Sequence, residues 1–410
     1  MAHLIRFCIL DFNEWGMIME NSKWKQYITI YSFFICIIGA VAAFVIFPKE
    51  SVSKAERRRL AEKPELTVEK LLDESYMEDL EEYLLDHFPF REGFRRIKAY
   101  FAYGVLGQKE NNGIYVENGY AAKLEYPLNE DSIKRLAGKM QTLKVQYFPN
   151  EDTWYAIVPD KNYFLAAPNG YPAINYEQMI TLLQQELSEE KTDKGFQYID
   201  IISGLSIEDY YNTDTHWKQE RLFDTVERLG NALGIEADLN LEAARYEYNQ
   251  ISDFYGVYYG QAALPMEADT ISYLTSDVIL AARVWNIEEN MLNAVVVMPF
   301  DEKAVWKPIY QLDKLEGQMH FDKYDVFLGG AASIQVMESP AAATDRKLVI
   351  FRDSYTSSLA PLLLEVYSTI TLVDLRYISS GMIGDYVDFD GADVLFLYNT
   401  SLVNQSNMLK

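Results

Sequence analysis

Apolar residues are unevenly distributed along the chain, and the longest run of them lies near the N-terminus. Residues 27–47 carry no charged side chain. As a helix rising about 1.5 Å per residue, they would cross the roughly 30 Å hydrocarbon core of a bilayer. A buried helix of a soluble protein is the alternative, but Pro48, Lys49 and Glu50 follow the run at once. We therefore expect a polar segment over residues 1–26 and a transmembrane helix over residues 27–47.

The segment after this run mixes charged and apolar residues at helical spacing. In residues 66–83 acidic side chains are interleaved with apolar ones, which predicts a helix. Pro89 then interrupts the pattern, because the residue before a proline is driven towards extended or turn conformations. Asn118-Gly119 has the chemistry of a hairpin turn. Residues 48–128 are therefore expected to form a helical juxtamembrane and hairpin region.

Helix and strand patterns alternate from residue 129 onwards. Asn129 is suited to cap a helix whose apolar residues keep helical spacing, and strand-like apolar runs follow at residues 153–158 and 196–201. Residues 176–187 have the pattern of a helix between these two strands. Such alternation predicts a parallel sheet covered by helices.

The last part of the chain again alternates strand and helix patterns, after a region that has mostly strand patterns. Residues 245–345 contain short alternating runs rich in Tyr, Val and Ile, such as residues 294–298, and we interpret them as a mostly antiparallel β insertion. A buried strand at residues 348–351, a helix and two further apolar β-rich runs then predict a doubly wound unit. We expect the whole of residues 129–410 to form one α/β domain.

Ser354 lies on the turn between the strand predicted at residues 348–351 and the helix predicted at residues 357–367. In open α/β sheets ligands bind at such turns, where backbone N–H groups can face an anion. A serine there can attack a carbonyl while adjoining amides stabilise the oxyanion. Serine is also among the best helix N-caps, so the turn by itself predicts either role.

Asp214 and His216 lie on a loop that enters the next predicted helix. On an extended backbone they can lie side by side, so that the carboxylate accepts from one imidazole nitrogen and leaves the other free. This is the arrangement of orienter and base in a serine hydrolase. The alternatives are a helix-start carboxylate, a histidine packed beside Trp217, and a metal pair. Metal is the weakest of these because no other histidine lies nearby in sequence and no cysteine exists to complete a soft site.

Polar residues follow the last two predicted strands, at the edge of the sheet that carries Ser354. The Asn399 amide can donate to an oxyanion, and the Arg376 cation can hold a substrate or brace its own loop. Turn formation and a surface ion pair are equally suitable roles for these two residues. Tyr377 and Trp217 complete the set of candidate substrate-binding residues.

The amino-acid composition excludes several classes of function. Of 410 residues, 49% are hydrophobic, which is ample for a large core, and the net charge of -24 argues against a nucleic-acid partner. Cys8 and Cys36 are the two cysteines of the chain, so the main domain can hold no disulfide framework and no thiolate nucleophile. Any histidine chemistry must use one of His3, His87, His216 and His320.

Together these residues resemble the DHHW family, which belongs with the alginate acetylation proteins in the SGNH hydrolase superfamily. The segments that carry the resemblance are Asp214-Thr215-His216-Trp217, Arg352-Asp353-Ser354-Tyr355, Asp374-Leu375-Arg376-Tyr377, Asp86-His87-Phe88-Pro89-Phe90-Arg91 and Val158-Pro159-Asp160-Lys161. The likeness runs from about residue 55 to the C-terminus. Two positions depart from the family pattern: Thr215 replaces the histidine of the family name, and Arg352 replaces the glycine of a Gly-Asp-Ser motif.

The resemblance implies a permuted SGNH-hydrolase-like α/β/α sandwich in which Asp214 and His216 precede the serine. Ser354 would be the nucleophile, His216 the general base and Asp214 its orienter, with no cofactor. The domain would lie outside the cytoplasmic membrane, with residues 1–26 inside. A count of lysines and arginines around the span would by itself place the domain in the cytoplasm, but the resemblance outweighs that count.

Our leading hypothesis is the first of three functions, and the other two are alternatives. The first is a membrane-anchored O-acetyltransferase that acetylates hydroxyls of a cell-surface or exported polysaccharide and works with a membrane-bound O-acyltransferase as acyl supplier. The second is a carbohydrate acetylesterase, which would use the same triad with water as acceptor. The third is a non-catalytic protein that binds glycan or a membrane partner and needs no serine chemistry.

Overall fold

The computed structural model describes residues 2–53, 55–72, 75–188, 195–292, 295–315 and 322–410. Two residues from the sequence predictions, His320 and Ala294, lie outside this set. The chain divides into two compact units: residues 1–53 with 58–97, and residues 54–57 with 98–410. We call them the anchor unit and the main unit and describe each by itself.

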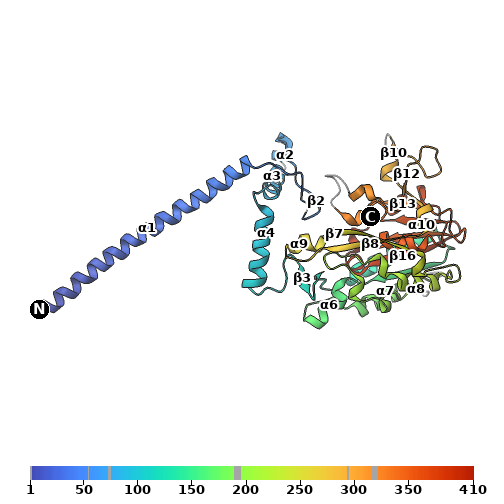
Figure 1. The fold of residues 1–410 in the computed structure, drawn as a ribbon, viewed down its shortest axis with the longest axis horizontal. Helices are drawn as coiled ribbons and strands as arrows, with labels where there is room; N and C mark the ends of the chain where they lie inside the picture. The colour runs from blue at the N-terminus through green and yellow to red at the C-terminus, as the bar shows by residue number, and fades with distance from the viewer. Residues whose placement is uncertain (1, 54, 73–74, 189–194, 293–294, 316–321) are drawn as a thin grey trace. The chain divides into compact units, whose positions relative to one another are not determined.

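The anchor unit begins with one long helix, α1 (Ala2–Ile46), drawn in blue in Figure 1. Within its stretch Trp24–Ile46, an 18-residue window has a mean hydropathy of 2.4, and the length and composition fit a membrane anchor and a signal sequence alike. The apolar helix predicted at residues 27–47 is therefore present. The structure differs upstream, where the helix continues through residues 2–26 that the sequence reading had treated only as a polar segment.

Short elements complete the anchor unit. They are β1 (Val52–Ser53), β2 (Arg58–Arg59), α2 (Val68–Leu72), α3 (Ser75–Asp86) and α4 (Arg91–Tyr100), whose last residues belong to the main unit. Asp86, at the end of α3, accepts hydrogen bonds from both terminal nitrogens of Arg58, at 2.8 and 2.5 Å, and from the Ala61 N–H at 2.9 Å. The Arg58 guanidinium lowers the pKa of the Asp86 carboxyl to about 2, so this ion pair joins β2 to α3 at neutral pH.

The main unit is built on one eight-stranded sheet with the order β12-β9-β13-β15-β14-β16-β5-β6. These strands are β12 (Trp306–Pro308), β9 (Arg283–Asn286), β13 (Ile334–Glu338), β15 (Thr369–Val373), β14 (Lys347–Arg352), β16 (Ala392–Asn399), β5 (Thr153–Val158) and β6 (Gln197–Tyr198). The five strands from β15 to β6 run parallel, whereas β13, β9 and β12 pair antiparallel. The unit is therefore a mixed α/β fold with a mostly parallel sheet.

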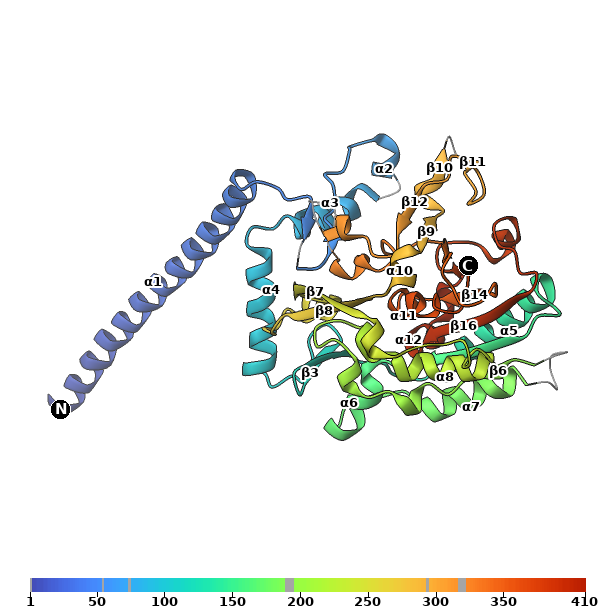
Figure 2. The same cartoon turned by 45° about the vertical axis from the view of Figure 1, so that its right-hand side comes forward.

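Alternate residues of the central strand β14 face two different layers. Leu348 and Ile350 pack into a cluster with side chains of α8 (Phe223–Leu233) and α11 (Thr356–Leu363). Val349 and Phe351 pack into a second cluster with side chains of the three helices α5 (Glu130–Tyr147), α7 (Tyr176–Glu186) and α12 (Thr400–Asn404). The sheet thus lies between two helical layers, because both faces of its strands are apolar. Figure 2 shows α12 beside β16.

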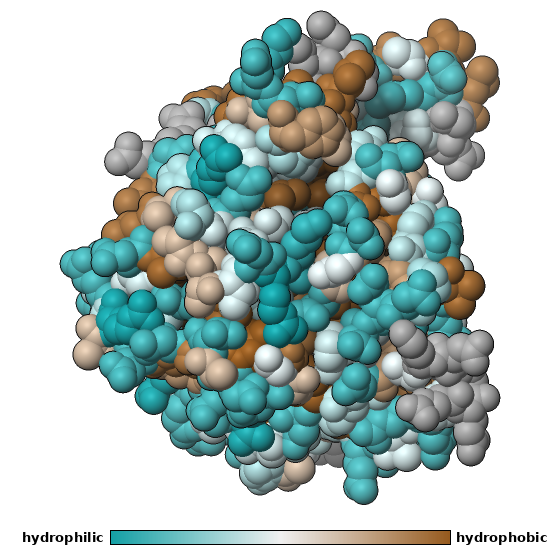
Figure 3. Space-filling model, turned by 90° about the vertical axis from the view of Figure 1, so that its right-hand side faces the viewer, coloured by the Kyte–Doolittle hydropathy of each residue, from teal (hydrophilic) through white to brown (hydrophobic). Residues whose placement is uncertain are grey.

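The remaining elements lie outside the central sheet. They are the hairpin of β3 (Ile114–Glu117) and β4 (Tyr120–Lys123), the pair β7 (Glu247–Phe254) and β8 (Asp269–Thr275), the pair β10 (Met291–Leu292) and β11 (Val295–Val296), and the helices α6 (Lys161–Asn169), α9 (Val257–Ala262) and α10 (Asp277–Ala281). Strand pairs between residues 245 and 345 are antiparallel where the structure describes them, but β9, β12 and β13 join the central sheet rather than forming a separate insertion. The face shown in Figure 3 is mostly hydrophilic, in keeping with the acidic composition.

Candidate active site

Ser354 lies just beyond the carboxyl end of β14, a strand with parallel neighbours on both sides. The preceding carboxylate, Asp353, fixes the turn: one oxygen accepts from the Tyr355 N–H at 3.0 Å and the other from the Asn399 N–H at 2.6 Å. Burial raises the pKa of Asp353. The side chain of Ser354 does not cap the helix that follows, because α11 begins after Tyr355 without a side-chain cap.

The loop that carries Asp214 is held at its backbone by two buried charged residues. Asp269, at the start of β8, accepts from the N–H groups of Asn212 at 2.9 Å and Thr213 at 2.7 Å. Lys161, the first residue of α6, donates from Nζ to the carbonyls of Tyr211 at 2.9 Å and Asn212 at 3.1 Å. Burial lowers the pKa of Lys161 to about 7. These contacts satisfy backbone groups that would be costly to bury unpaired.

Asp214 and His216 meet through a bend of this loop rather than on an extended backbone. The His216 N–H donates to Asp214 Oδ1 at 3.0 Å, and the chain bends at both residues. This local hydrogen bond brings the two side chains to the same side of the loop.

Ser354, His216 and Asp214 form a continuous hydrogen-bonded chain. Ser354 Oγ is 2.7 Å from His216 Nε2, and His216 Nδ1 is 2.5 Å from Asp214 Oδ1. Asp214 and His216 are both buried, whereas Ser354 is partly exposed. The carboxylate is placed to keep a proton on Nδ1, so that Nε2 is free to accept the serine proton, as in a Ser-His-Asp triad.

The second oxygen of Asp214 contacts groups that sequence reasoning missed. Asp214 Oδ2 accepts from Arg57 at 2.9 Å and from the Val257 N–H, at the start of α9, at 2.8 Å. Burial by itself disfavours the charged carboxylate, but His216 and Arg57 hold its pKa well below the usual range. Arg57 also forms an ion pair with Asp322. Asp214 therefore stays ionised while buried.

Aromatic rings fix the plane of the imidazole. The His216 ring stacks on Tyr324 with 3.9 Å between centroids and 6° between planes, and meets Tyr355 edge-on at 5.1 Å. The Tyr355 hydroxyl in turn donates to the Thr215 carbonyl at 2.7 Å. Neither tyrosine was singled out as a site residue from the sequence, because their contacts with His216 span many positions of the chain.

Trp217 and Arg352 both lie in the interior. Trp217 is fully buried, and its Nε1 donates to the Tyr355 carbonyl at 2.9 Å and to Ser358 Oγ at 3.1 Å. A substrate contact through this indole, which the sequence reading included, does not fit that placement. Arg352 directs its guanidinium to Ser357 Oγ at 2.8 Å and Gln335 Oε1 at 2.7 Å. Its side chain is therefore buried between the start of α11 and β13.

The other predicted rim residues have structural partners. Arg376 donates to Asp374 through its backbone N–H, Nε and a terminal nitrogen, at 3.1, 2.9 and 2.6 Å, and although burial acts against its charge, this pairing raises the pKa of Arg376. Tyr377 is half exposed beside it. Asn399 uses its side-chain oxygen to cap α12, accepting from the Leu402 N–H at 2.8 Å, so its remaining polar group is the amide NH2, a donor.

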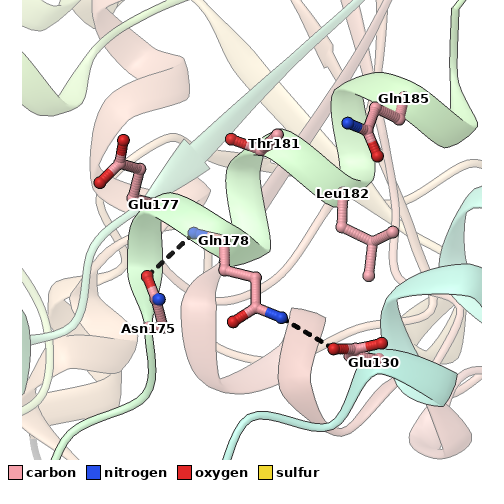
Figure 4. A pocket seen from close by; sticks show the side chains of 7 residues that line it. All are labelled: Glu130, Asn175, Glu177, Gln178, Thr181, Leu182 and Gln185. Carbon is pink, nitrogen blue, oxygen red and sulfur yellow. Dashed lines mark hydrogen bonds between the residues drawn. The ribbon is translucent and has the colours of Figure 1, made fainter.

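A separate hollow of about 490 Å³ lies along α7. Figure 4 shows Gln178 between two partners in this hollow, with its amide bonded to Glu130 at 2.8 Å and its backbone N–H bonded to Asn175 at 3.0 Å. Its lining residues are Glu130, Asn175, Glu177, Gln178, Thr181, Leu182 and Gln185. The triad residues are not among them, so the hollow is distinct from the candidate active site.

Comparison with known proteins finds similar folds among solved structures. No family model and no curated protein matches the sequence. Among solved structures, a DHHW family protein from Eubacterium siraeum matches with a TM-score of 0.54 and 19% identity, over 73% of this chain and 94% of that one. Bacillus cereus PatB1, solved with a sulfonyl adduct, matches with a TM-score of 0.53 and 15% identity, over 71% and 95%. The O-acetyltransferase domain of Pseudomonas putida AlgJ has a TM-score of 0.39 and 10% identity, over 71% and 92%.

The main unit is thus an α/β protein with a hydrogen-bonded Ser, His and Asp at the carboxyl edge of its sheet. The resemblance expected from the sequence is confirmed for the fold, since the similar structures include a DHHW family protein and PatB1. At these identities the likeness concerns the fold alone.

Proposed function

We propose that this protein is a membrane-anchored O-acetyltransferase that acts on hydroxyls of a cell-surface or exported polysaccharide. The observation that carries the proposal is the unbroken chain from Ser354 Oγ through His216 to Asp214, at 2.7 and 2.5 Å. The fold shared with the DHHW family protein and the sequence resemblance to alginate acetylation proteins support it.

The first half-reaction loads an acetyl group onto the serine. Ser354 Oγ attacks the carbonyl of an acetyl donor while His216 Nε2 takes the hydroxyl proton, and Asp214 stabilises the imidazolium that results. The C–O bond to the donor then breaks, and the leaving oxygen takes the proton from His216. The Asn399 amide is the candidate side-chain donor to the oxyanion of the tetrahedral intermediate.

The second half-reaction reverses these roles. A hydroxyl of the glycan gives its proton to His216 Nε2 as its oxygen attacks the acetyl-serine carbonyl, and Ser354 regains the proton when its own C–O bond breaks. The acceptor decides the reaction class, because water in place of the glycan makes the same triad an esterase. Arg376 and Tyr377, at the carboxyl edge next to Ser354, are the candidate contacts to the acceptor.

The proposal includes a topology and a partner. Asp214 and His216 precede Ser354 in the chain, so the fold would be a permuted member of the SGNH type. In this topology α1 is a retained signal anchor, residues 1–26 are cytoplasmic and the main unit is extracytoplasmic. An acyl supplier on the far side of the bilayer is then required, and a membrane-bound O-acyltransferase has the necessary chemistry.

Mass spectrometry of the full chain in detergent tests the proposal. The protein is incubated with 4-nitrophenyl acetate, with and without a hydroxyl-rich oligosaccharide, beside Ser354→Ala and the control Ser203→Ala, a serine whose hydroxyl accepts from Arg228 at 3.0 Å. Acetyl transfer to the sugar that Ser354→Ala abolishes and Ser203→Ala retains is the expected result. Acetate release that ignores the sugar would make the protein an esterase. Wild type that is inert towards several esters and towards a sulfonyl fluoride would overturn the triad and leave a binding protein.

A further inference from the structure

Helix α4 of the anchor unit has an exposed apolar face. Phe90, directly before the helix, is 67% exposed, and Phe94 and Ile97 are 55% and 65% exposed. Phe94 and Ile97 are three residues apart, the spacing that places side chains on one side of a helix, and Phe90 lies just before the helix with a positive φ. Large apolar side chains grouped in this way mark a surface that another surface covers. We call this set the α4 apolar face.

No core within the anchor unit covers this face. In the described part of residues 58–97, every Leu, Ile, Val, Phe and Met side chain is at least partly exposed. The hydrophobic clusters found in the described chain all consist of residues beyond position 110. The α4 apolar face is therefore not the inner side of a small folded core.

Basic residues lie beside the α4 apolar face. Arg91, Arg95 and Arg96 belong to the same helix; Arg91 pairs with Asp86 at 3.7 Å and with Glu92 at 3.3 Å, and Arg95 pairs with Glu92 at 3.0 Å. A helix with large apolar residues on one side and arginines around them is typical of helices that lie in a membrane interface. The charges complement anionic phospholipid headgroups.

The helix also begins where the apolar helix α1 ends. The ring of Phe47, one residue beyond α1, meets the Phe90 ring edge-on with 5.1 Å between centroids. One turn earlier, Phe44 of α1 meets Tyr83 of α3 at 6.0 Å. Both contacts lie within the anchor unit. If α1 crosses a bilayer, the start of α4 is therefore at the surface of that bilayer.

We propose that the α4 apolar face is embedded in the headgroup layer of the membrane that α1 crosses, with the neighbouring arginines among anionic phospholipids. This proposal rests on the membrane anchoring included in the proposed function. The chain would then be held at the membrane in two ways, by a helix through the bilayer and by a second helix lying on it.

Site-directed spin labelling of the full chain can test this, because Cys8 and Cys36 are its two cysteines. The background variant Cys8→Ser/Cys36→Ser receives Phe94→Cys or Ile97→Cys, and each is labelled with a nitroxide in vesicles of phosphatidylglycerol and phosphatidylcholine. Cys36, which is exposed within α1, is labelled in Cys8→Ser as the reference for lipid. Val145→Cys on α5, at a position 75% exposed, is the reference for water. Power saturation then compares contact with oxygen, which concentrates in lipid, and with a water-soluble nickel chelate.

The expected result is a preference for oxygen over nickel at positions 94 and 97 that is several-fold higher than at position 145. Replacing all phosphatidylglycerol by phosphatidylcholine is expected to reduce that preference. A preference for oxygen over nickel at positions 94 and 97 that equals the preference at position 145 would overturn the proposal. Labels at 94 and 97 that are shielded from both reagents would also overturn it, because they would indicate a protein partner or a second copy of the chain. A Cys36 label that is in water would refute the membrane anchoring included in the proposed function. A Cys36 label in lipid, with the labels at 94 and 97 in water, would refute only the membrane contact of the α4 apolar face. None of these readouts depends on acetyl transfer.

Discussion

Replacement of Asp214 by asparagine probes the candidate triad without changing its shape. All four groups that bond to the carboxylate are hydrogen-bond donors. Oδ1 accepts from the backbone N–H and the Nδ1 of His216, and Oδ2 accepts from Arg57 and the Val257 N–H. An asparagine amide has one acceptor oxygen and one donor NH2. In either orientation, the NH2 must therefore face groups that donate in the wild type.

The strengths of the hydrogen bonds determine which orientation the asparagine amide adopts. A bond to the charged Arg57 contributes about 1.5–3 kcal/mol, more than a neutral one, so the amide oxygen is expected to turn towards Arg57 and Val257. The NH2 then faces His216 Nδ1, which can accept it only if the imidazole proton moves to Nε2. That tautomer cannot take the proton of Ser354. The corresponding loss in serine proteases is about 10⁴-fold in kcat, or roughly 5 kcal/mol of transition-state stabilisation.

Stopped assays with 4-nitrophenyl acetate and the rate of labelling by a sulfonyl fluoride measure this loss. The control is Asp224→Asn, which removes a carboxylate paired with Arg228 at 2.7 Å on the surface. We expect Asp214→Asn to react about 10⁴-fold more slowly at neutral pH and the control to react like the wild type. An Asp214→Asn protein that is folded by circular dichroism and retains more than about a tenth of the rate would refute the orienting role.

Two further predictions concern residues that only the structure revealed. Arg57→Gln removes one charge-assisted bond to Asp214, so we expect kcat/KM to fall roughly 10- to 100-fold, with partial rescue by Arg57→Lys; unchanged steady-state kinetics would contradict this. For Lys161 the pKa falls from an ordinary 10.5 to about 7 in the folded protein. The unfolded chain therefore binds more protons between these values, and stability rises with pH there. Calorimetry should show the Tm of the wild type rising relative to Lys161→Met between pH 7 and 10, and parallel profiles would show that Lys161 does not titrate in this range.

Much of the local structure is determined by the sequence. The run at residues 153–158 forms β5 with the predicted bounds, and Asn129 caps α5 by accepting from the Ser132 N–H. Asn118 and Gly119 form the expected hairpin turn, both with positive φ. These features depend on side-chain periodicity and on the backbone preferences of a few adjacent residues, so they can be predicted without knowledge of long-range contacts.

The sequence also names the candidate triad, but through the resemblance to the DHHW family, because the spacing of Asp214, His216 and Ser354 fits other roles equally well. What it cannot supply is the direction in which each side chain points. Trp217 is adjacent to His216 in sequence, yet its indole is fully buried beneath the start of α11. Whether a loop residue faces solvent or the core depends on the path of the loop across the sheet, which no local pattern encodes.

Tertiary structure alone supplies the surroundings of the triad. Arg57 reaches Asp214 across 157 positions of the chain, and Val257 reaches it across 43. Tyr324 stacks on His216 from a third segment. Each of these residues has a side chain or backbone group that suits many places in a protein, so its type predicts no role. Only the folding of distant segments around one buried carboxylate gives them that role, because a charge removed from water must be neutralised by whatever groups the fold brings to it.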